Sequence, residues 1–326
     1  MRSSFLRKFS IATVLSSTLI ITDISQAAEP LKIGYSDWPG YVAWQVAIEK
    51  GWFKEAGVDV KFDWFDYSAS LDAFTAGKID ADSTNNGDAL VTSAGGAKNV
   101  MIMLTDYSNG NDMIVGKPGV KSLKDLKGKK IGLETGLVEH LLLLDGLQKA
   151  GMKESDVTIV NTKTNETPQA LASADIAAIG AWQPNSGQAM KLVPGSKPIY
   201  TSAQAPGLIY DVLVVSPTSL SSRKDDWAKV VKVWGKVVAY INDPKTQPDA
   251  IKIMSARVGL TPEAYKPLLK GTRLLNLAEG KAAFVKADGL KSLYGSSKIA
   301  DDFNVKNAIY KEPQDLSKAI DPVFNK

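Results

Sequence analysis

The hydrophobic and polar positions of the chain form short apolar runs that alternate with segments of helical periodicity. The first apolar run, at residues 31–35, is followed by a Ser-Asp turn, a Pro-Gly pair and a helical pattern that reaches Lys50. Ser, Asp and Pro commonly begin helices, so this stretch predicts a strand, a turn and a helix. The turn places Trp38 and Tyr41 at the carboxyl end of a strand, where open α/β sheets bind ligands. The alternative is that both rings only pack the helix onto the sheet.

The same succession of elements occurs twice along the chain. A second strand, turn and helix begin at residues 129–136, and the later anchors of the two copies also lie about 97 residues apart. In each copy a second helix and a short strand lead into a polar, amide-rich loop, at residues 83–88 and 181–186. Two such β-α-β-α-β units predict two lobes with a cleft between them.

The two lobes are expected to be connected by two crossings. A buried strand at residues 100–104 leads into a polar stretch that we interpret as the first crossing, and residues 206–215 carry the chain back. We expect the lobes to close about these crossings, near residues 109–112 and near Asp211. The predicted domains are a first lobe at residues 28–112 continued by residues 213–326, and a second lobe at residues 113–212.

From residue 216 onward the pattern is mostly helical. Long helices are expected at residues 226–241 and 277–293. Trp227 and Trp234 are seven positions apart on the first of these helices, so they share one face. We expect that face to pack in the core.

The composition is typical of a soluble globular protein. The 326 residues are 44% hydrophobic and 23% charged, and the length suggests about two domains. The formal net charge of +4 is too small to indicate nucleic-acid binding. The sequence contains no cysteine and one histidine, which excludes disulfides, thiol catalysis and zinc sites built from Cys and His within one chain. We expect no cofactor, no metal and no enzymatic activity.

The N-terminus has the pattern of a cleaved signal peptide at residues 1–27. Arg2 and Arg7 precede an apolar run, and Ser25 and Ala27 supply the small residues of a signal-peptidase site. The apolar run is shorter than the ~20 residues needed to span a bilayer, and no cysteine follows it for lipid attachment. The sequence therefore predicts an exported, unanchored protein of the periplasm.

Several short motifs carry a family resemblance. They are Ile33-Gly34-Tyr35 with Trp38, Glu49-Lys50-Gly51-Trp52-Phe53, Ala76-Gly77 with Ile79-Asp80-Ala81, the segment 122–131, and Ala178 with Trp182 and Pro184. In this order they resemble the periplasmic solute-binding proteins of the nitrate/sulfonate/taurine type, which deliver ligands to ABC importers. The resemblance implies an α/β fold of the type II periplasmic binding protein class, with two lobes, a cleft and two crossing strands. It also implies a monomer that works with permease subunits in the inner membrane.

Polar and aromatic groups at the predicted strand ends are the candidate ligand contacts. His140 joins them because similar proteins often have a polar residue near this position that faces the cleft; the alternative is a hydrogen-bonded spectator. Asn85 and Asp88 could instead cap the helix that follows them, and Trp182 could belong to the core. The predicted ligand-binding residues are Trp38, Tyr41, Asn85, Asn86, Asp88, Glu134, His140, Trp182, Gln183 and Asp211.

The charge of the predicted cleft segments argues against an anionic ligand. Residues 79–97, 164–190 and 199–222 contain no Lys or Arg, but they contain carboxylates such as Asp88 and Asp211. Each helix N-terminus stabilises a bound anion by about 0.3–1 kcal/mol. Carboxylates buried against the anion would destabilise the complex by more than this. We therefore expect a small nitrogen-containing ligand, neutral or cationic, stacked on tryptophan. A sulfonate-type compound, which the family implies, is the alternative.

The expected function is the capture of a small solute and its delivery to the permease of an ABC importer. Two other functions are compatible with the fold: a thiamin-pyrimidine-type enzyme or precursor-binding protein, and a ligand-sensing partner of a membrane receptor. Enzymes of the first kind rely on histidine and cysteine chemistry, whereas this sequence has one His and no Cys. An importer and a sensor would use the same closed form, so both stay open at this point.

Overall fold

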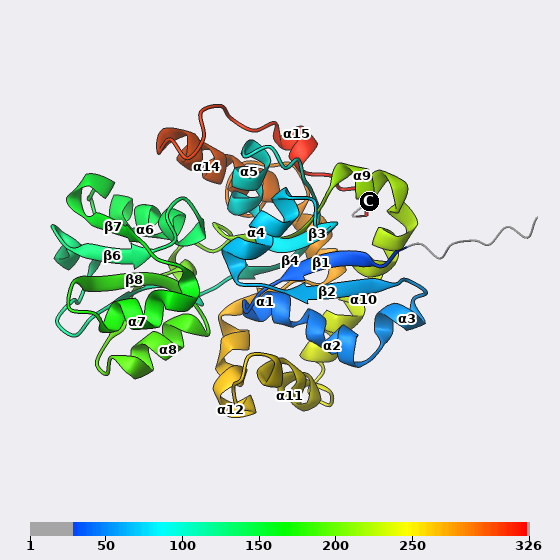
Figure 1. Ribbon diagram of the computed structural model, residues 1–326, viewed down its shortest axis with the longest axis horizontal. Coiled ribbons are helices and arrows are strands. Elements are labelled where there is room, and N and C mark those ends of the chain that lie inside the picture. The colour runs from blue at the N-terminus through cyan, green and yellow to red at the C-terminus, as the bar shows by residue number, and fades with distance from the viewer. Residues whose placement is uncertain (1–28, 325–326) are drawn as a thin grey trace, which may run out of the picture.

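Two β-sheets organise the computed structural model, which describes residues 29–324 (Figure 1). The predicted signal peptide lies outside the described residues. Within residues 29–324, no helix is both long enough and apolar enough to cross a membrane. The five-stranded sheet lies at the left of Figure 1 and the six-stranded sheet to its right. We call the regions around them the second lobe and the first lobe.

The six-stranded sheet begins with the strand that the sequence predicts at residues 31–35. Its order is β11-β4-β10-β3-β1-β2. Strands β2, β1 and β3 are parallel, whereas β10 is antiparallel to both of its neighbours, β3 and β4. The strands are β1 Leu31–Tyr35, β2 Val60–Trp64, β3 Ala81–Asn85, β4 Val100–Ser108, β10 Tyr210–Val215 and β11 Thr272–Leu274. The helices between the first of them are α1 Pro39–Val42, α2 Trp44–Glu49, α3 Trp52–Glu55, α4 Tyr67–Thr75 and α5 Asn86–Ala94.

The five-stranded sheet repeats this plan, as the duplicated pattern predicts. Its order is β7-β6-β8-β5-β9, with β7, β6 and β8 parallel and β5 antiparallel beside β8. The strands are β5 Asp112–Gly116, β6 Lys130–Leu133, β7 Thr158–Asn161, β8 Ile176–Trp182 and β9 Lys197–Thr201. The helices are α6 Val138–Lys149, α7 Thr167–Ala172 and α8 Asn185–Leu192. Short 3-10 helices lie at Leu123–Leu126, Glu154–Asp156, Thr164–Glu166, Ser202–Gln204 and Lys266–Lys270.

The chain passes between the sheets twice, from β4 to β5 and from β9 to β10. The two crossings are hydrogen-bonded to one another, because Ser108 Oγ lies 2.6 Å from Ser202 Oγ and the Gly110 N–H donates to Ser202 Oγ at 2.7 Å. The first crossing is less loop-like than expected, since β4 continues to Ser108. Pairing with β10 and β11 supplies the partners that extend this strand. The domain boundaries at residues 112 and 212 stay a prediction.

The C-terminal helices differ from the pattern in one place. The single helix expected at residues 277–293 is wrong, because α13 ends at Ala283 and α14 begins at Leu293. Ser292 begins the new helix: its Oγ accepts from the Tyr294 N–H and donates to the Val285 carbonyl. The helices of this part are α9 Pro217–Ser222, α10 Lys224–Asn242, α11 Gln247–Arg257, α12 Pro262–Tyr265, α13 Leu277–Ala283, α14 Leu293–Lys306 and α15 Leu316–Ala319.

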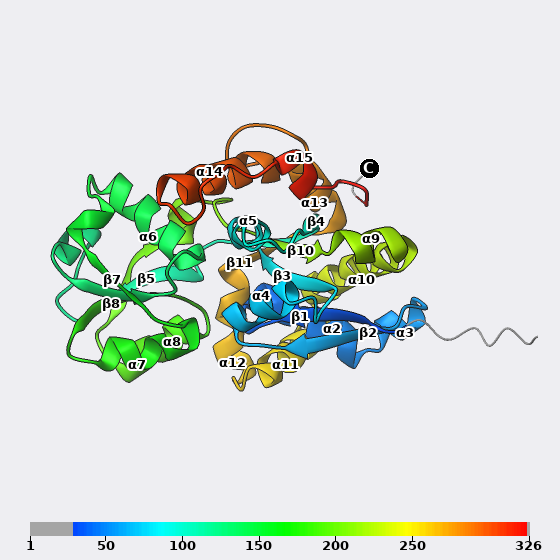
Figure 2. The same cartoon turned by 45° about the horizontal axis from the view of Figure 1, so that its top comes forward.

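Helix α14 packs on α5 of the first lobe and reaches toward α6 of the second (Figure 2). Its Phe303 ring makes an edge contact with His140 of α6, with 5.7 Å between ring centroids. The helix therefore contacts the second lobe in addition to the two crossings.

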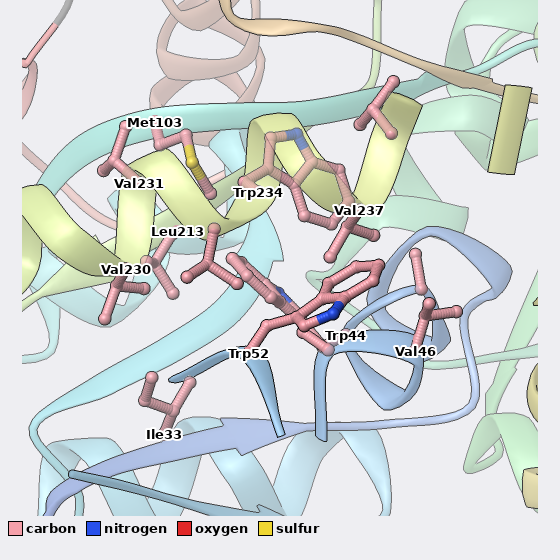
Figure 3. Close-up of a cluster of buried hydrophobic side chains, with 14 of the residues drawn as sticks. Ile33, Trp44, Val46, Trp52, Met103, Leu213, Val230, Val231, Trp234 and Val237 are labelled. Carbon is pink, nitrogen blue, oxygen red and sulfur yellow. The ribbon is translucent and has the colours of Figure 1, made fainter. Parts of the chain in front are cut away.

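The core of the first lobe joins its N-terminal helices to α10 (Figure 3). Trp44 of α2 and Trp234 of α10 are both fully buried, with 4.7 Å between their ring centroids. Trp227 is fully buried as well. Both tryptophans that the sequence places on one face of this helix thus pack in the core, as expected.

Two glycines form a matched pair for a stability prediction. Gly77 follows α4 with a φ of 66°, whereas Gly280 lies inside α13, where an added Cβ would meet its first neighbour at 3.8 Å. Gly77→Ala is expected to destabilise the protein by about 1 kcal/mol, because L side chains rarely adopt a left-handed backbone. Gly280→Ala is expected to be neutral or to stabilise by up to about 1 kcal/mol. Urea denaturation of both variants measures the difference, and equal effects would contradict it.

Candidate functional site

A small pocket lies between the lobes, where helix starts and strand ends of both sheets meet. Its cavity volume is about 10 Å³, which is room for about one water molecule. Pockets for drug-sized ligands occupy about 300–1,000 Å³, so this one admits only a very small group. We call it the inner pocket; its lining residues are Trp38, Tyr41, Tyr67, Asn85, Asp112, Val138, Trp182, Ile209 and Asp211.

A pair of buried carboxyl groups lies on the first-lobe side of the inner pocket. Asp106 and Asp211 are directly opposite one another on β4 and β10. Trp38 Nε1 donates to Asp106 Oδ1 at 2.9 Å, and the Tyr41 hydroxyl donates to Asp211 Oδ1 at 2.5 Å. Gly40 allows this close approach, because a Cβ there would lie 2.0 Å from Asp106 Oδ2.

Burial raises the pKa of both members of this pair. Burial raises the pKa of Asp106 to about 6, and burial together with the nearby Asp106 charge raises that of Asp211 well above its usual range. The remaining Oδ2 atoms of both residues receive no N–H or O–H donor from the described residues. A contact between the two carboxyl groups therefore needs a shared proton or a bound cation.

A second pair of buried carboxyl groups lies on the second-lobe side. Asp112 begins β5 and is 3% exposed, and Glu139 of α6 is fully buried. Burial raises the pKa of Asp112 to about 7 and, with the nearby Asp112 charge, that of Glu139 well above its usual range. Asp112 Oδ2 and both Glu139 oxygens receive no donor within the described part of the chain. The pocket is thus flanked by acidic groups from both lobes.

A hydrogen-bond network fixes the side of the pocket formed by β3, α4 and α5. The Tyr67 hydroxyl donates to Asp88 Oδ2 at 2.7 Å, and Asn85 Nδ2 donates to the same oxygen at 2.6 Å. Asn85 Oδ1 also accepts from the Asp88 N–H at 2.9 Å, which caps α5. Burial raises the pKa of Asp88 to about 6. Asn85 therefore both caps a helix and lines the pocket.

Hydrogen bonds join the two lobes across the cleft. Asp37, in the turn after β1, accepts from Trp182 Nε1 at 2.9 Å and from Asn185 Nδ2 at 2.7 Å. We call these three residues the cleft bridge. The Trp182 ring also makes an edge contact with Tyr67 of the first lobe, with 5.0 Å between centroids. The Val138 N–H adds a further link by donating to Asp88. These contacts describe a closed arrangement of the lobes.

An outer groove continues from the inner pocket toward the solvent. Glu134 lies in it and accepts from Thr164 Oγ1 at 3.1 Å, and burial raises the pKa of Glu134 to about 7. Lys163 and Arg257 also line this groove. The Arg257 guanidinium lies 4.0 Å from the centroid of the Trp64 ring. The expectation of a cleft without basic side chains is therefore wrong for the outer groove, because Lys163 precedes one of the predicted segments and Arg257 comes from a distant helix.

The structure brings together only some of the predicted ligand-binding residues. Those that line the inner pocket are Trp38, Tyr41, Asn85, Trp182 and Asp211, and Glu134 lies in the outer groove. Those that line neither are Asn86, Asp88, His140 and Gln183. Ligand contacts by all ten residues stay a prediction.

The residues outside the pocket walls have other partners. Asn86 donates to Ser296 and Ser297 of α14. His140 accepts from the Gly136 N–H through Nδ1, while its Nε2 lies 3.2 Å from Glu154, and burial lowers its pKa. Gln183 hydrogen-bonds through its backbone N–H to the Asn111 carbonyl.

Sequence reasoning missed Tyr67 and Asp112 as pocket residues. Tyr67 begins a helix just after β2, so the rule that selected Trp38 would also have found it. Asp112 was expected only in the hinge, where the crossing also makes it part of the pocket wall. Asp37 follows β1 and meets the same rule, although its partner Trp182 comes from a distant segment. Asp106 lies within β4, and its role depends on its pairing with the distant β10.

Known proteins are similar to this chain in sequence and in fold. A Brucella abortus (strain 2308) protein, provisionally named a binding protein, is 33% identical over 196 residues, which are 60% of this chain and 59% of the relative. The match thus spans about three fifths of the relative's length.

Solved structures match over most of the chain. The alkanesulfonate-binding protein SsuA from Xanthomonas axonopodis pv. citri, bound to MOPS, has a TM-score of 0.75 at 17% identity and covers 90% of this chain and 99% of its own. The desulfurization enzyme DszB has a TM-score of 0.66 at 15% identity and covers 91% of this chain and 98% of its own. The predicted α/β periplasmic binding protein fold is confirmed. A family model described as NMT1/THI5 like matches residues 38–245, more than half of the chain, so this chain belongs to the NMT1/THI5 like family.

Proposed function

We propose that the protein is the periplasmic solute-binding component of an ABC importer, which captures a small molecule between its lobes and presents the closed form to a permease. The cleft bridge is the observation that carries this proposal. Asp37 belongs to the first lobe, while Trp182 and Asn185 belong to the second. Their hydrogen bonds exist only when the lobes are close, so a ligand that favours closure would form them.

The hinge of this closure is proposed at the two crossings, where Ser108 and Ser202 meet. The first crossing has only residues 109–111 outside strands, whereas the second has residues 202–209. Changes in the backbone angles of these two segments would rotate one sheet against the other. The proposed moving bodies follow the predicted division, residues 28–112 with 213–326 and residues 113–212, except that Asp112 of β5 moves with the second sheet and residues 210–212 of β10 move with the first.

The ligand is proposed to be a small nitrogen-containing compound. The resemblance to a sulfonate-binding structure supports a sulfonate-type ligand instead, and Lys163 and Arg257 supply positive charge in the outer groove. The inner pocket, in contrast, is lined by the carboxyl groups of Asp112 and Asp211 and by no Lys, Arg or His. Its chemistry favours the nitrogen compound.

An enzymatic role receives less support, although DszB shares the fold. The chain has no cysteine, and its histidine is buried against Phe303 and Glu154 outside the pocket walls. The remaining alternative is a sensor that presents its closed form to a membrane receptor. Genes for a permease and an ATPase next to the gene for this protein would favour the importer.

The purified protein is expected to carry or bind one small solute and to become more compact when it does. Mass spectrometry of material released by denaturation identifies a retained solute. Re-addition of that solute at about 100 times its Kd should stabilise the protein by about 2.7 kcal/mol. Small-angle scattering should show a smaller radius of gyration with the solute. Conversion of the solute to a product, or identical scattering profiles at saturation, would contradict the proposed function.

A further inference from the structure

The inner pocket offers a bound molecule acceptors and hardly any donors. Each side-chain N–H or O–H group on its wall already donates to a protein oxygen: Trp38 to Asp106, Tyr41 to Asp211, Tyr67 and Asn85 to Asp88, and Trp182 to Asp37. The N–H of Val138, at the start of α6, is also directed at Asp88. A nitrate or sulfonate needs donors, and these groups are engaged.

The polar atoms left over on the pocket wall are carboxyl oxygens. Asp112 Oδ2 and Asp211 Oδ2 receive no donor from the described residues, although both side chains are 3% exposed. Asp112 comes from the second lobe and Asp211 from the first, so these acceptors lie on both sides of the pocket. Each of these carboxyl groups faces a second one, Glu139 for Asp112 and Asp106 for Asp211. Such a pair needs a shared proton or a bound cation, and a cationic molecule with N–H groups would supply the latter.

We propose that the inner pocket binds a small cation with several N–H donors, of the ammonium, amidinium or guanidinium class, through Asp112 and Asp211, each of which is backed by a second buried carboxyl group. This inference rests on the proposed function and names the ligand class of the same site. The aromatic rings of Trp38, Tyr41, Tyr67 and Trp182 complete the wall. Aromatic faces attract cations, most strongly when water is excluded. With a volume of about 10 Å³ the pocket excludes polyamines and peptides, and a guanidinium would enter only with a slight opening of the cleft.

A bound cation would also neutralise the negative charge of the carboxyl groups when the lobes close. The titratable groups on the pocket wall are Tyr41, Tyr67, Asp112 and Asp211. The buried carboxyl groups behind them are Asp88, Asp106 and Glu139. Closure without a cation requires these carboxyl groups to hold protons, because burial raises the pKa of Asp106 to about 6 and that of Asp112 to about 7. A cation replaces those protons. Its affinity is therefore expected to rise between pH 5 and pH 7.5, whereas a neutral or anionic ligand would bind less well over the same range.

Isothermal titration calorimetry with three planar probes of similar shape tests the charge. Guanidinium, urea and nitrate carry charges of +1, 0 and −1, and methylammonium and methanesulfonate provide a second pair. We expect guanidinium or methylammonium to bind at least about tenfold more tightly than urea, nitrate and methanesulfonate. Tight binding of nitrate or methanesulfonate would overturn the cation proposal and leave the proposed function intact. Failure of both cations, or preference for Ca²⁺ or Mg²⁺, would also overturn it.

Near-isosteric variants test the residues. Asp211→Asn and Asp112→Asn are expected to weaken cation binding at least about tenfold and to flatten the rise with pH, because each removes a charged acceptor. Asp82→Asn is the matched control, since Asp82 is also fully buried with a pKa raised by burial to about 8 but lies outside the pocket wall. It should change the affinity by less than about twofold. Equal losses in all three variants, or none in Asp211→Asn and Asp112→Asn, would overturn the assignment.

Discussion

Asp37→Ala is expected to weaken solute binding by about 10- to 100-fold, which corresponds to about 1.4–2.8 kcal/mol. Asp37 accepts two hydrogen bonds from the opposite lobe, from Trp182 and Asn185. Hydrogen bonds to a charged group contribute about 1.5–3 kcal/mol, and both are present only when the cleft is closed. Their loss destabilises the closed form relative to the open one, so the effect should lie mainly in faster dissociation.

Calorimetry and stopped-flow dissociation with the tightest ligand measure this effect. Asp66→Ala is the matched control, because Asp66 lines the same outer groove and is exposed. The Asp66→Ala variant removes one negative charge at the rim of the groove. Within residues 29–324 it breaks no hydrogen bond across the cleft, so it should change the affinity by less than about threefold. If Asp37→Ala bound as tightly as the unmodified protein, the cleft bridge would not hold the closed form.

Trp234→Ala is expected to reduce the free energy of unfolding by about 3–5 kcal/mol. Trp234 is fully buried, lies against Trp44 with 4.7 Å between centroids, and donates from Nε1 to the Leu275 carbonyl at 3.0 Å. Truncation leaves a large cavity between α10 and the N-terminal helices and an acceptor without its donor. Together these losses should lower the urea midpoint strongly.

Leu192→Ala provides the comparison on the surface. Leu192 ends α8 and is 52% exposed, so its truncation should change stability by less than about 0.5 kcal/mol. Trp234→Phe keeps most of the packing and should fall between the two. If the Trp234→Ala variant had the same urea midpoint as the unmodified protein, the core would tolerate this cavity by rearrangement.

Local patterns were sufficient to predict the strands and the duplication. Strand β1 has the expected bounds, because its apolar run is delimited by a turn signal on the side of Ser36. The helix expected at residues 277–293 was wrong, since the break depends on hydrogen bonds of Ser292 and on a left-handed Gly289 within an otherwise helical composition. Such breaks are set by tertiary contacts as much as by periodicity.

The candidate site was predictable where one strand end defines it. Trp38, Trp182 and Asp211 follow or occupy strand ends and line the inner pocket. The pairing of Asp106 with Asp211 was not predictable, because it depends on the register between strands more than 100 residues apart. Lys163 and Arg257 show the same limit, since their place in the outer groove comes from the packing of elements distant in sequence.

The central position of β10 in the first sheet sets the order in which the lobes can form. Strands β5 to β9 come from one continuous segment, so the second sheet pairs entirely within residues 112–201. Strands β3 and β4 are joined only by β10, which follows the entire second lobe in the chain. Pairing across such a separation is slow, and unpaired strand edges promote association with other chains. The first lobe is therefore the later part to fold and, until β10 inserts, the part most prone to aggregation.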